Sequence, residues 1–215
     1  MPAAPMLFYA SQAGASTFDA DAGGGNPFAS ALIDLLARPT LALTELRAEL
    51  VALTMRKSDG LQVPDTSHAL GDTAWQLRPV PPDPARRALV FVYADYRHPG
   101  MPPLPGARRD LERVGDALWN AGFAVTSLVD PTATSLRAAL HDLATDSRDA
   151  EAAVVYATGH GFEHRGDVYL IPNDVPASDD TARMVEASIR VADLADHLQA
   201  SAANLVFFGG CRSEW

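Results

Sequence analysis

Four short apolar runs of strand type, separated by amphipathic stretches, fill the chain from residue 88 onward. They lie at residues 88–96, 124–130, 151–161 and 204–211. Continuous apolar runs of this length are typical of strands that are buried on both faces of a sheet. Consecutive parallel strands need a crossover connection, which is usually a helix. The alternation therefore predicts an α/β fold, with a mostly parallel sheet and helices on both faces.

The stretches between these runs carry apolar residues at helical spacing. After the first run, Leu111, Val114 and Leu118 fall on one helix face. Gly122 follows as a residue suited to the helix end. Before the last run, Ser188 is suited to cap a helix. The spacing therefore predicts a helix in each connection between the runs.

The first 77 residues have a different organisation. A strand is predicted at residues 6–14, followed by two amphipathic helices at 26–39 and 40–57. The first helix has Asn26 as its cap and Pro27 at its first helical position. One strand and two helices cannot bury their own apolar faces, so we expect this segment to dock onto the later sheet.

A proline-rich stretch joins the two parts of the chain. Its four prolines, between residues 79 and 84, predict a stiff and extended connector. The expected organisation is a single domain over residues 1–215, with an N-terminal segment at 1–77, the connector at 78–87 and a C-terminal segment at 88–215.

Charge and composition argue against several classes of function. The chain carries 27 acidic and 17 basic residues, which disfavours a nucleic-acid partner because phosphate backbones demand basic patches. Its apolar runs are too short to span a membrane, and its first residues lack the pattern of a secretory signal. The single cysteine allows no internal disulfide, so a cytoplasmic location is expected. None of these features indicates an oligomeric state.

Two reactive side chains come at the ends of predicted strands. His160 ends the third run, and Cys211 ends the fourth. Ligands of open α/β sheets bind at the carboxyl ends of the strands. If the two strands are neighbours, an imidazole and a thiol face one cleft, where the imidazole can activate the thiol for acyl transfer. The alternative is an inert buried thiol and a structural histidine. The other histidines do not repeat a metal-ligand spacing, so no zinc site is predicted.

The stretches ALVFVYADY, VVYATGHG, DVYLIPND and LVFFGGCR follow one another in the C-terminal part. With the His-Gly pair at 160–161 and the Cys-Arg pair at 211–212, they resemble caspase-like cysteine peptidases, the group of caspases, metacaspases and orthocaspases. The resemblance covers residues 88–212. Around the cysteine, GGCRS agrees with the caspase pattern Gln-Ala-Cys-Arg-Gly only in its Cys and Arg.

The N-terminal stretch LFYASQAGASTFDADAGGGNPFASALIDLL resembles the small subunit of the same family. In ordinary caspases this segment follows the catalytic cysteine, whereas here it precedes the segment that resembles the large subunit. The order is similar to that of type III metacaspases, or to a circular permutation. The resemblance implies a caspase-like three-layer fold in permuted order. Its six-stranded, mostly parallel sheet would place the strand at 6–14 beside the strand that ends at Cys211.

The resemblance also implies a cysteine endopeptidase that acts on a protein or peptide substrate. Cys211 would attack the scissile carbonyl, and His160 would handle the protons. The backbone N–H groups of Gly161 and Cys211 would form the oxyanion hole. No third side chain that orients His160 is evident, and a backbone carbonyl can serve instead.

Metacaspases and orthocaspases cleave after Arg or Lys, and the resemblance implies the same preference here. Asp110 matches one of their pocket aspartates, and Thr158 stands where a small hydroxyl residue lines the pocket wall. Gly209 replaces another pocket aspartate, for which Asp19 is expected to compensate. Paired carboxylates suit a buried guanidinium. The alternatives are a first-turn helix acid at Asp110 and a solvated loop acid at Asp19.

No cofactor is expected. Asp167, in a hairpin predicted over residues 162–174, matches a calcium-ligand position of many metacaspases. The companion acidic run is reduced to Glu186, and calcium prefers six or more oxygen ligands. We therefore expect no calcium requirement and no other metal, and we interpret Asp167 as a hairpin-turn residue.

Two other functions stay open. The departures around GGCRS are consistent with a pseudo-enzyme, a caspase-fold interaction module whose cysteine does not react. A doubly wound sheet that binds a nucleotide or another small ligand is disfavoured, because the sequence lacks a phosphate-binding glycine motif after its first strand.

Overall fold

The computed structural model describes residues 1–19, 24–66, 75–78, 83–97, 100–175, 178 and 180–214. Its centre is a six-stranded sheet with the strand order β3-β1-β11-β7-β5-β6. The strands of this sheet are β1 (Pro5–Tyr9), β3 (Asp65–Thr66), β5 (Asp83–Val92), β6 (Phe123–Val129), β7 (Ala152–Thr158) and β11 (Ala203–Phe208). All neighbouring pairs are parallel except the pair of β3 with β1. The predicted α/β fold with a six-stranded, mostly parallel sheet is therefore confirmed.

The first strand of the sequence lies beside the last one. Leu7 of β1 is opposite Val206 of β11, and Phe8 is opposite Phe207. The rings of Phe8 and Phe207 stack with their centroids 5.0 Å apart. Every residue of β11 is buried, because β1 and β7 cover its two edges and helices cover its faces. The predicted docking of the N-terminal strand against the sheet is thus confirmed.

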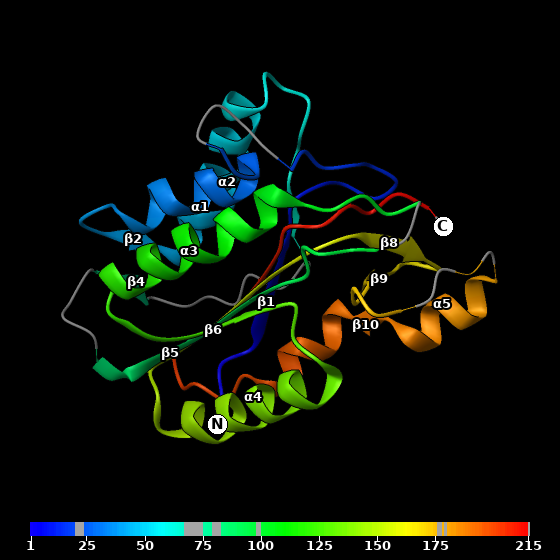
Figure 1. Ribbon diagram of the computed structural model, residues 1–215. Coiled ribbons are helices and arrows are strands. Elements are labelled where there is room, and N and C mark those ends of the chain that lie inside the picture. The colour runs from blue at the N-terminus through cyan, green and yellow to red at the C-terminus, as the bar shows by residue number, and fades with distance from the viewer. Residues whose placement is uncertain are drawn as a thin grey trace.

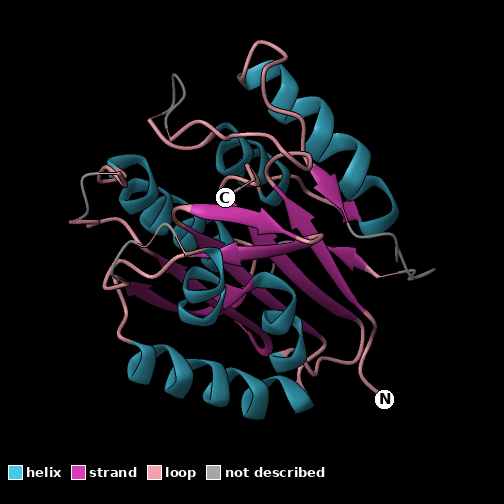
Figure 2. Ribbon diagram, turned by 90° about the vertical axis from the view of Figure 1, so that its right-hand side faces the viewer, coloured by secondary structure: helices cyan, strands magenta, loops and turns pink. Residues whose placement is uncertain are grey.

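Helices cover both faces of the sheet (Figure 1). On one face lie α1 (Pro27–Leu36), α2 (Leu43–Lys57) and α3 (Pro105–Asn120), and on the other lie α4 (Ala133–Asp146) and the 3-10 helix η2 (Val191–His197). Figure 2 shows the strands between the two helical layers. Because successive strand residues point to opposite faces, Phe8 and Phe207 pack with the first group of helices. Leu7 and Val206 pack with the second.

The predicted signals at helix ends operate in the structure. The Asn26 side chain accepts a hydrogen bond from the Phe28 N–H at 2.8 Å, and Pro27 is the first residue of α1. Gly122 follows α3 with a φ of +92°, a conformation that favours glycine. Its N–H donates to the Trp119 carbonyl at 2.9 Å. The start of α1 and the end of α3 are therefore explained by the types of residue at these positions.

The segment between the third and fourth predicted strands differs from the prediction at one point. The strands β8 (Gly161–His164) and β9 (Asp167–Leu170) form the expected hairpin, which β10 (Ile189–Arg190) extends. A helix that was not predicted, α5 (Thr181–Ala187), precedes this position, and the Asp180 side chain caps it by accepting from the Ala182 N–H at 3.0 Å. Ser188 follows this helix, so its prediction as an N-cap was wrong. Val191 and Leu194 are buried as expected, but on η2.

The first predicted strand is shifted toward the N-terminus. β5 starts at Asp83, so residues 83–87 of the expected connector belong to a strand, whereas the prolines at 79, 81 and 82 lie outside the described residues. The strand ends at Val92. Beyond it, the Ala94 and Asp95 N–H groups donate to the side-chain carboxylate of Asp130 at 2.8 and 3.1 Å instead of to the backbone of a neighbouring strand.

Short elements complete the structure. β2 (Leu41–Ala42) pairs with β4 (Gln76–Leu77), and the 3-10 helix η1 (Ser147–Asp149) follows α4.

Candidate active site

His160 and Cys211 follow adjacent strands and line the same cavity. β7 and β11 pair in parallel, with Ala157 opposite Phe208, so the residues after both strands lie at one edge of the sheet. The cavity there has a volume of about 120 Å³. The predicted site side chains that line it are Asp19, Asp110, Thr158, His160 and Cys211. A larger cavity of about 430 Å³ lies between α4 and the β5–β6 edge, and the described residues that line it include neither a cysteine nor a histidine.

The thiol of Cys211 is half-buried against the N-terminal segment. Among the described residues its hydrogen-bond partner is Thr17, whose N–H and hydroxyl both lie 3.3 Å from Sγ. The backbone of the next residue, Arg212, is also bound to the N-terminal segment. Its N–H donates to the Ala15 carbonyl, and its carbonyl accepts from the Gly14 N–H, each at 2.9 Å. Residues 14–17 thus form the wall against which the cysteine loop rests.

His160 is oriented by main-chain and phenolic groups. Its Nε2 lies 2.8 Å from the carbonyl oxygen of Pro102. Because a carbonyl can only accept, Nε2 carries the proton and Nδ1 is left unprotonated in the neutral ring. The His160 N–H donates to the Tyr96 hydroxyl at 2.9 Å, and that hydroxyl donates to the Ile171 carbonyl at 2.6 Å. The expected backbone carbonyl is therefore present, on Pro102.

Tyr96 was not singled out by the sequence. Its ring meets the His160 ring edge-on, with centroids 4.5 Å apart. Burial raises the pKa of Tyr96 well above the ordinary value of a tyrosine, so the hydroxyl stays neutral and remains a donor. The only feature of the sequence that could have indicated Tyr96 is its position, as a tyrosine shortly after a buried strand.

Two glycines allow the loops after β7 and β11 to pack backbone against backbone. A Cβ on Gly161 would lie 2.8 Å from the Cys211 carbonyl oxygen. A Cβ on Gly210 would lie 2.7 Å from the Gly159 carbonyl oxygen. Neither side chain could be accommodated without moving main-chain atoms. The glycines therefore bring the two loops together.

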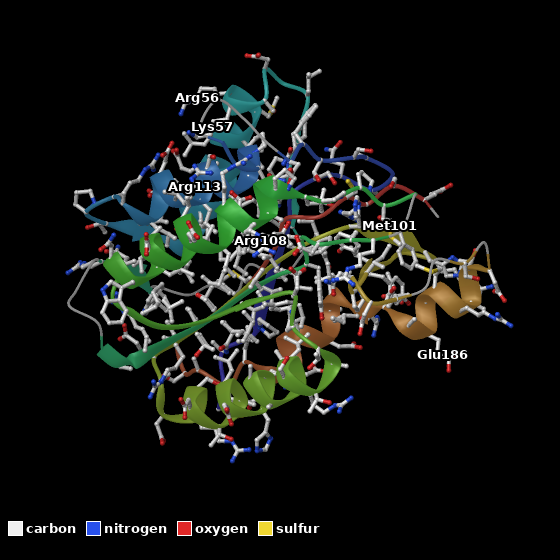
Figure 3. The ribbon with its side chains drawn as sticks, in the orientation of Figure 1. Arg56, Lys57, Met101, Arg108, Arg113 and Glu186 are labelled. Atoms are coloured by element: carbon white, nitrogen blue, oxygen red, sulfur yellow. The ribbon has the colours of Figure 1, made fainter. Side chains whose placement is uncertain are left out.

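The two candidate pocket acids differ in their surroundings. Asp110 is fully buried, and its carboxylate accepts from the Asn26 N–H at 3.0 Å and pairs with Arg113 at 3.2 Å. Arg113 projects from α3 toward α1 (Figure 3). Asp19 accepts from two N–H groups in the first turn of α3, those of Gly106 and Ala107, at 2.8 and 3.0 Å. Asp19 is thus tied to a helix N-terminus and is not a solvated loop acid.

Gly209 lies above two buried hydroxyl groups. A Cβ at this position would come 2.7 Å from the Thr158 hydroxyl oxygen and 3.0 Å from that of Tyr156. Thr158 is only 4% exposed, and Tyr156 is completely buried. A glycine at this position therefore fits the close packing, and an aspartate would require both hydroxyls to move.

Arg212 anchors the residue after the cysteine to the sheet. Its guanidinium contacts the Glu163 carboxylate at 3.0 Å and the Asp65 carboxylate at 2.8 Å. It also lies over the Tyr9 ring, 4.6 Å from the centroid. The side chain is almost completely buried. Arg212 therefore joins the cysteine loop to β1, β3 and β8.

The two residues considered for calcium lie apart from the cavity. Asp167 is ion-paired with Arg190 at 2.7 Å, an interaction that raises the pKa of the guanidinium. Glu186 projects outward from α5 (Figure 3). Within the described residues there is no group of three or more His, Cys, Asp or Glu side chains arranged to hold a metal.

A family model described as the caspase domain matches residues 85–214, a stretch that includes both His160 and Cys211. The match covers more than half of the 215 residues, and it confirms the resemblance of the C-terminal part to caspase-like peptidases. The comparison with curated proteins found no match. None of the helices in the described part of the chain is long and apolar enough to cross a membrane.

Proposed function

Because the chain belongs to the caspase-domain family of cysteine peptidases, we propose that it is an endopeptidase whose catalytic pair is Cys211 and His160. The observation that carries the proposal is the shared cavity at the ends of β7 and β11, which both side chains line. A thiol and an imidazole held in one tautomer, both lining one cavity, have the composition required for acyl transfer.

In the proposed reaction, the Cys211 sulfur attacks the scissile carbonyl carbon and its proton passes to Nδ1 of His160. The contact of Nε2 with the Pro102 carbonyl supports this role, because it stabilises the ring when both nitrogens are protonated. The carbonyl electron pair moves onto oxygen, where the N–H groups of Gly161 and Cys211 are the proposed donors. Loss of one such donor typically raises the activation free energy of the reaction by about 2.7–4 kcal/mol.

The tetrahedral adduct then collapses. The C–N bond breaks as His160 returns its proton to the departing amine, and a thioester links the acyl group to Cys211. Water hydrolyses this thioester and regenerates the thiol. Each of these steps uses only groups that line the cavity or lie in the loops around it.

We propose further that the residue before the cleaved bond is Arg or Lys. Among the described residues that line the cavity, Asp19 and Asp110 supply carboxylates and no lysine or arginine is present, although Arg113, outside this lining, pairs with Asp110 at 3.2 Å. A cationic side chain entering there would find acceptor oxygens, with Thr158 as the proposed wall residue. Turnover of matched fluorogenic peptides ending in Arg, Lys or Asp measures the preference. Preferential cleavage after Asp would contradict it.

We also propose that residues 1–215 form one domain in permuted order. The position of β1 beside β11 supports this, since the segment that resembles the small subunit supplies the neighbour of the cysteine strand. In this proposal, residues 1–77 are the small-subunit segment and residues 88–215 the large-subunit segment. Urea unfolding followed by circular dichroism and by alkylation of Cys211 should give one coincident transition. Two separate transitions would contradict a single domain.

The decisive experiment is labelling with a peptidyl chloromethyl ketone that ends in arginine. The intact protein should be labelled at one site, Cys211, and the Cys211→Ala variant should be neither labelled nor active. His160→Ala should keep the fold but lose turnover. A folded protein that resists labelling and cleaves no peptide would favour the pseudo-enzyme over the peptidase.

A further inference from the structure

We propose that Thr17 is a positioning residue for the nucleophile, holding the Cys211 sulfur with two hydrogen bonds and stabilising its thiolate. The N–H and the hydroxyl oxygen of Thr17 each lie 3.3 Å from Sγ, within the range of hydrogen bonds to sulfur. Thr17 comes from the loop after β1, and Cys211 comes from the loop after β11. The inference rests on the proposed role of Cys211, but it can be tested on the thiol alone.

The loop that carries Thr17 is itself held in place. On one side, the Ala15 carbonyl accepts from the Arg212 N–H at 2.9 Å and from the Ser11 hydroxyl at 3.1 Å. On the other side, the Phe18 N–H donates to the Gln62 side chain at 3.2 Å. Because the residues flanking Thr17 are anchored, its two polar groups meet the sulfur in a preset position.

The two groups of Thr17 act differently on the sulfur. The N–H can only donate, and a thiolate is a better acceptor than a thiol, so this bond favours the charged form. The hydroxyl can accept from the S–H of the thiol and can rotate to donate to the thiolate. When the Cys211 proton passes to His160, the sulfur therefore gains a second donor without any movement of the backbone.

Other charged groups around the thiol are left in place when Thr17 is changed. In the cavity these are His160, Asp19 and Asp110, and behind the loop they are Arg212, Glu163 and Asp65. Thr17→Val removes the hydroxyl but keeps the N–H and nearly the same shape. Thr17→Ser keeps both donors and removes only a methyl group.

The single cysteine of the chain makes the test direct, since iodoacetamide alkylation of the intact protein reports Cys211 alone. We expect Thr17→Val to be alkylated about three- to tenfold more slowly at pH 7, with its rate profile displaced to higher pH. Thr17→Ser should restore the wild-type profile. Ser16→Ala, at an exposed neighbouring position, should leave the profile unchanged. A wild-type profile in Thr17→Val, or no rescue in Thr17→Ser, would overturn the proposal.

Peptide turnover separates this inference from the proposed function. If the chain is a peptidase, Thr17→Val should lower kcat and leave KM nearly unchanged, because the hydroxyl acts on the sulfur. A changed alkylation profile in a protein that cleaves no peptide would support Thr17 and reject the peptidase. Normal alkylation of Thr17→Val in a protein that does cleave peptides would reject the Thr17 proposal alone.

Discussion

The Nε2 atom of His160 lies 2.8 Å from the carbonyl oxygen of Pro102, so the backbone of the loop before α3 orients the imidazole. The acceptor is a main-chain atom, which no side-chain substitution removes. It also leaves Nδ1 as the basic nitrogen of the neutral ring. This relationship makes His160 the residue through which the proposed proton transfer is tested most directly.

Replacing His160 with alanine is expected to lower kcat/KM for a peptide substrate by about 10²–10⁴-fold, the usual contribution of a general acid–base group. His141→Ala is the matched control, because His141 is exposed on α4 and should leave turnover unchanged. Steady-state kinetics with an arginine-ended fluorogenic peptide give the comparison. Equal activity of His160→Ala and wild type would remove His160 from the mechanism.

Arg212→Met should destabilise the fold by about 2–4 kcal/mol, because it leaves the Glu163 carboxylate largely buried without its cation. The control is Arg183→Met, whose ion pair with Asp180 is exposed and should contribute about 0–1 kcal/mol. Urea unfolding of both variants measures the difference. A loss for Arg212→Met no larger than that of the control would mean that the buried contacts of Arg212 do not stabilise the cysteine loop.

Gly161→Ala should destabilise the protein by about 1–3 kcal/mol and impair catalysis, since its Cβ would meet the Cys211 and Tyr169 carbonyl oxygens at 2.8 and 3.0 Å. Gly115→Ala provides the contrast within α3. Its Cβ would meet nothing closer than the Ser127 hydroxyl at 3.4 Å, and alanine is the better helix former by about 0.5–1 kcal/mol. Thermal unfolding should rank Gly115→Ala at or above wild type and Gly161→Ala below it; the reverse order would contradict the packing argument.

Two buried tyrosines should respond differently to loss of their hydroxyl groups. Tyr96→Phe removes the donor to Ile171 and the acceptor for the His160 N–H, which should cost about 1–3 kcal/mol. The Tyr156 hydroxyl makes no hydrogen bond of ordinary geometry with the described residues, so Tyr156→Phe should lie within about 0.5 kcal/mol of wild type. Urea unfolding distinguishes the variants, and equal losses would show that Tyr156 has a partner of its own.

Stability should decline above about pH 10, the ordinary range of tyrosine ionisation. Burial raises the pKa of Tyr96 and of Tyr156 in the folded protein. Above about pH 10 the unfolded chain therefore binds fewer protons than the folded one, and the free energy of unfolding falls as pH rises. Each such group contributes up to about 1.4 kcal/mol per pH unit, and none of this effect acts well below pH 10. Urea unfolding from pH 8 to 11 should show a shallower decline in Tyr156→Phe; identical slopes would count against the shift.

Most of the sheet could be predicted from the sequence because continuous apolar runs mark its longer strands. β7 and β11 are buried throughout and, apart from Thr158 and Asn204, apolar, so short apolar runs located them without any knowledge of their neighbours. Short or polar elements were harder to find. The two-residue strand β3 carries no periodic pattern, and α5 was missed because the cap at Asp180 precedes only seven helical residues.

The candidate site was predictable only in part, for a related reason. His160 and Cys211 stand at strand ends, and a parallel sheet brings such ends to one edge. No comparable pattern in the sequence indicated which groups contact these two side chains. The Pro102 carbonyl is a group that every residue carries, and the two contacts of Thr17 join residues 194 positions apart in the sequence.

The sequence by itself determined the long strands, the longer helices and the two reactive side chains at strand ends, because periodicity, caps and apolar runs are local properties. The tertiary structure alone decided what surrounds the thiol and the imidazole. It set Thr17 against the sulfur, Pro102 against the ring and the Asn26 N–H against the Asp110 carboxylate. These contacts depend on register and on main-chain direction at hydrogen-bond distance. The contact of Thr17 with Cys211, in particular, forms only once β1 and β11, from the two ends of the chain, lie side by side.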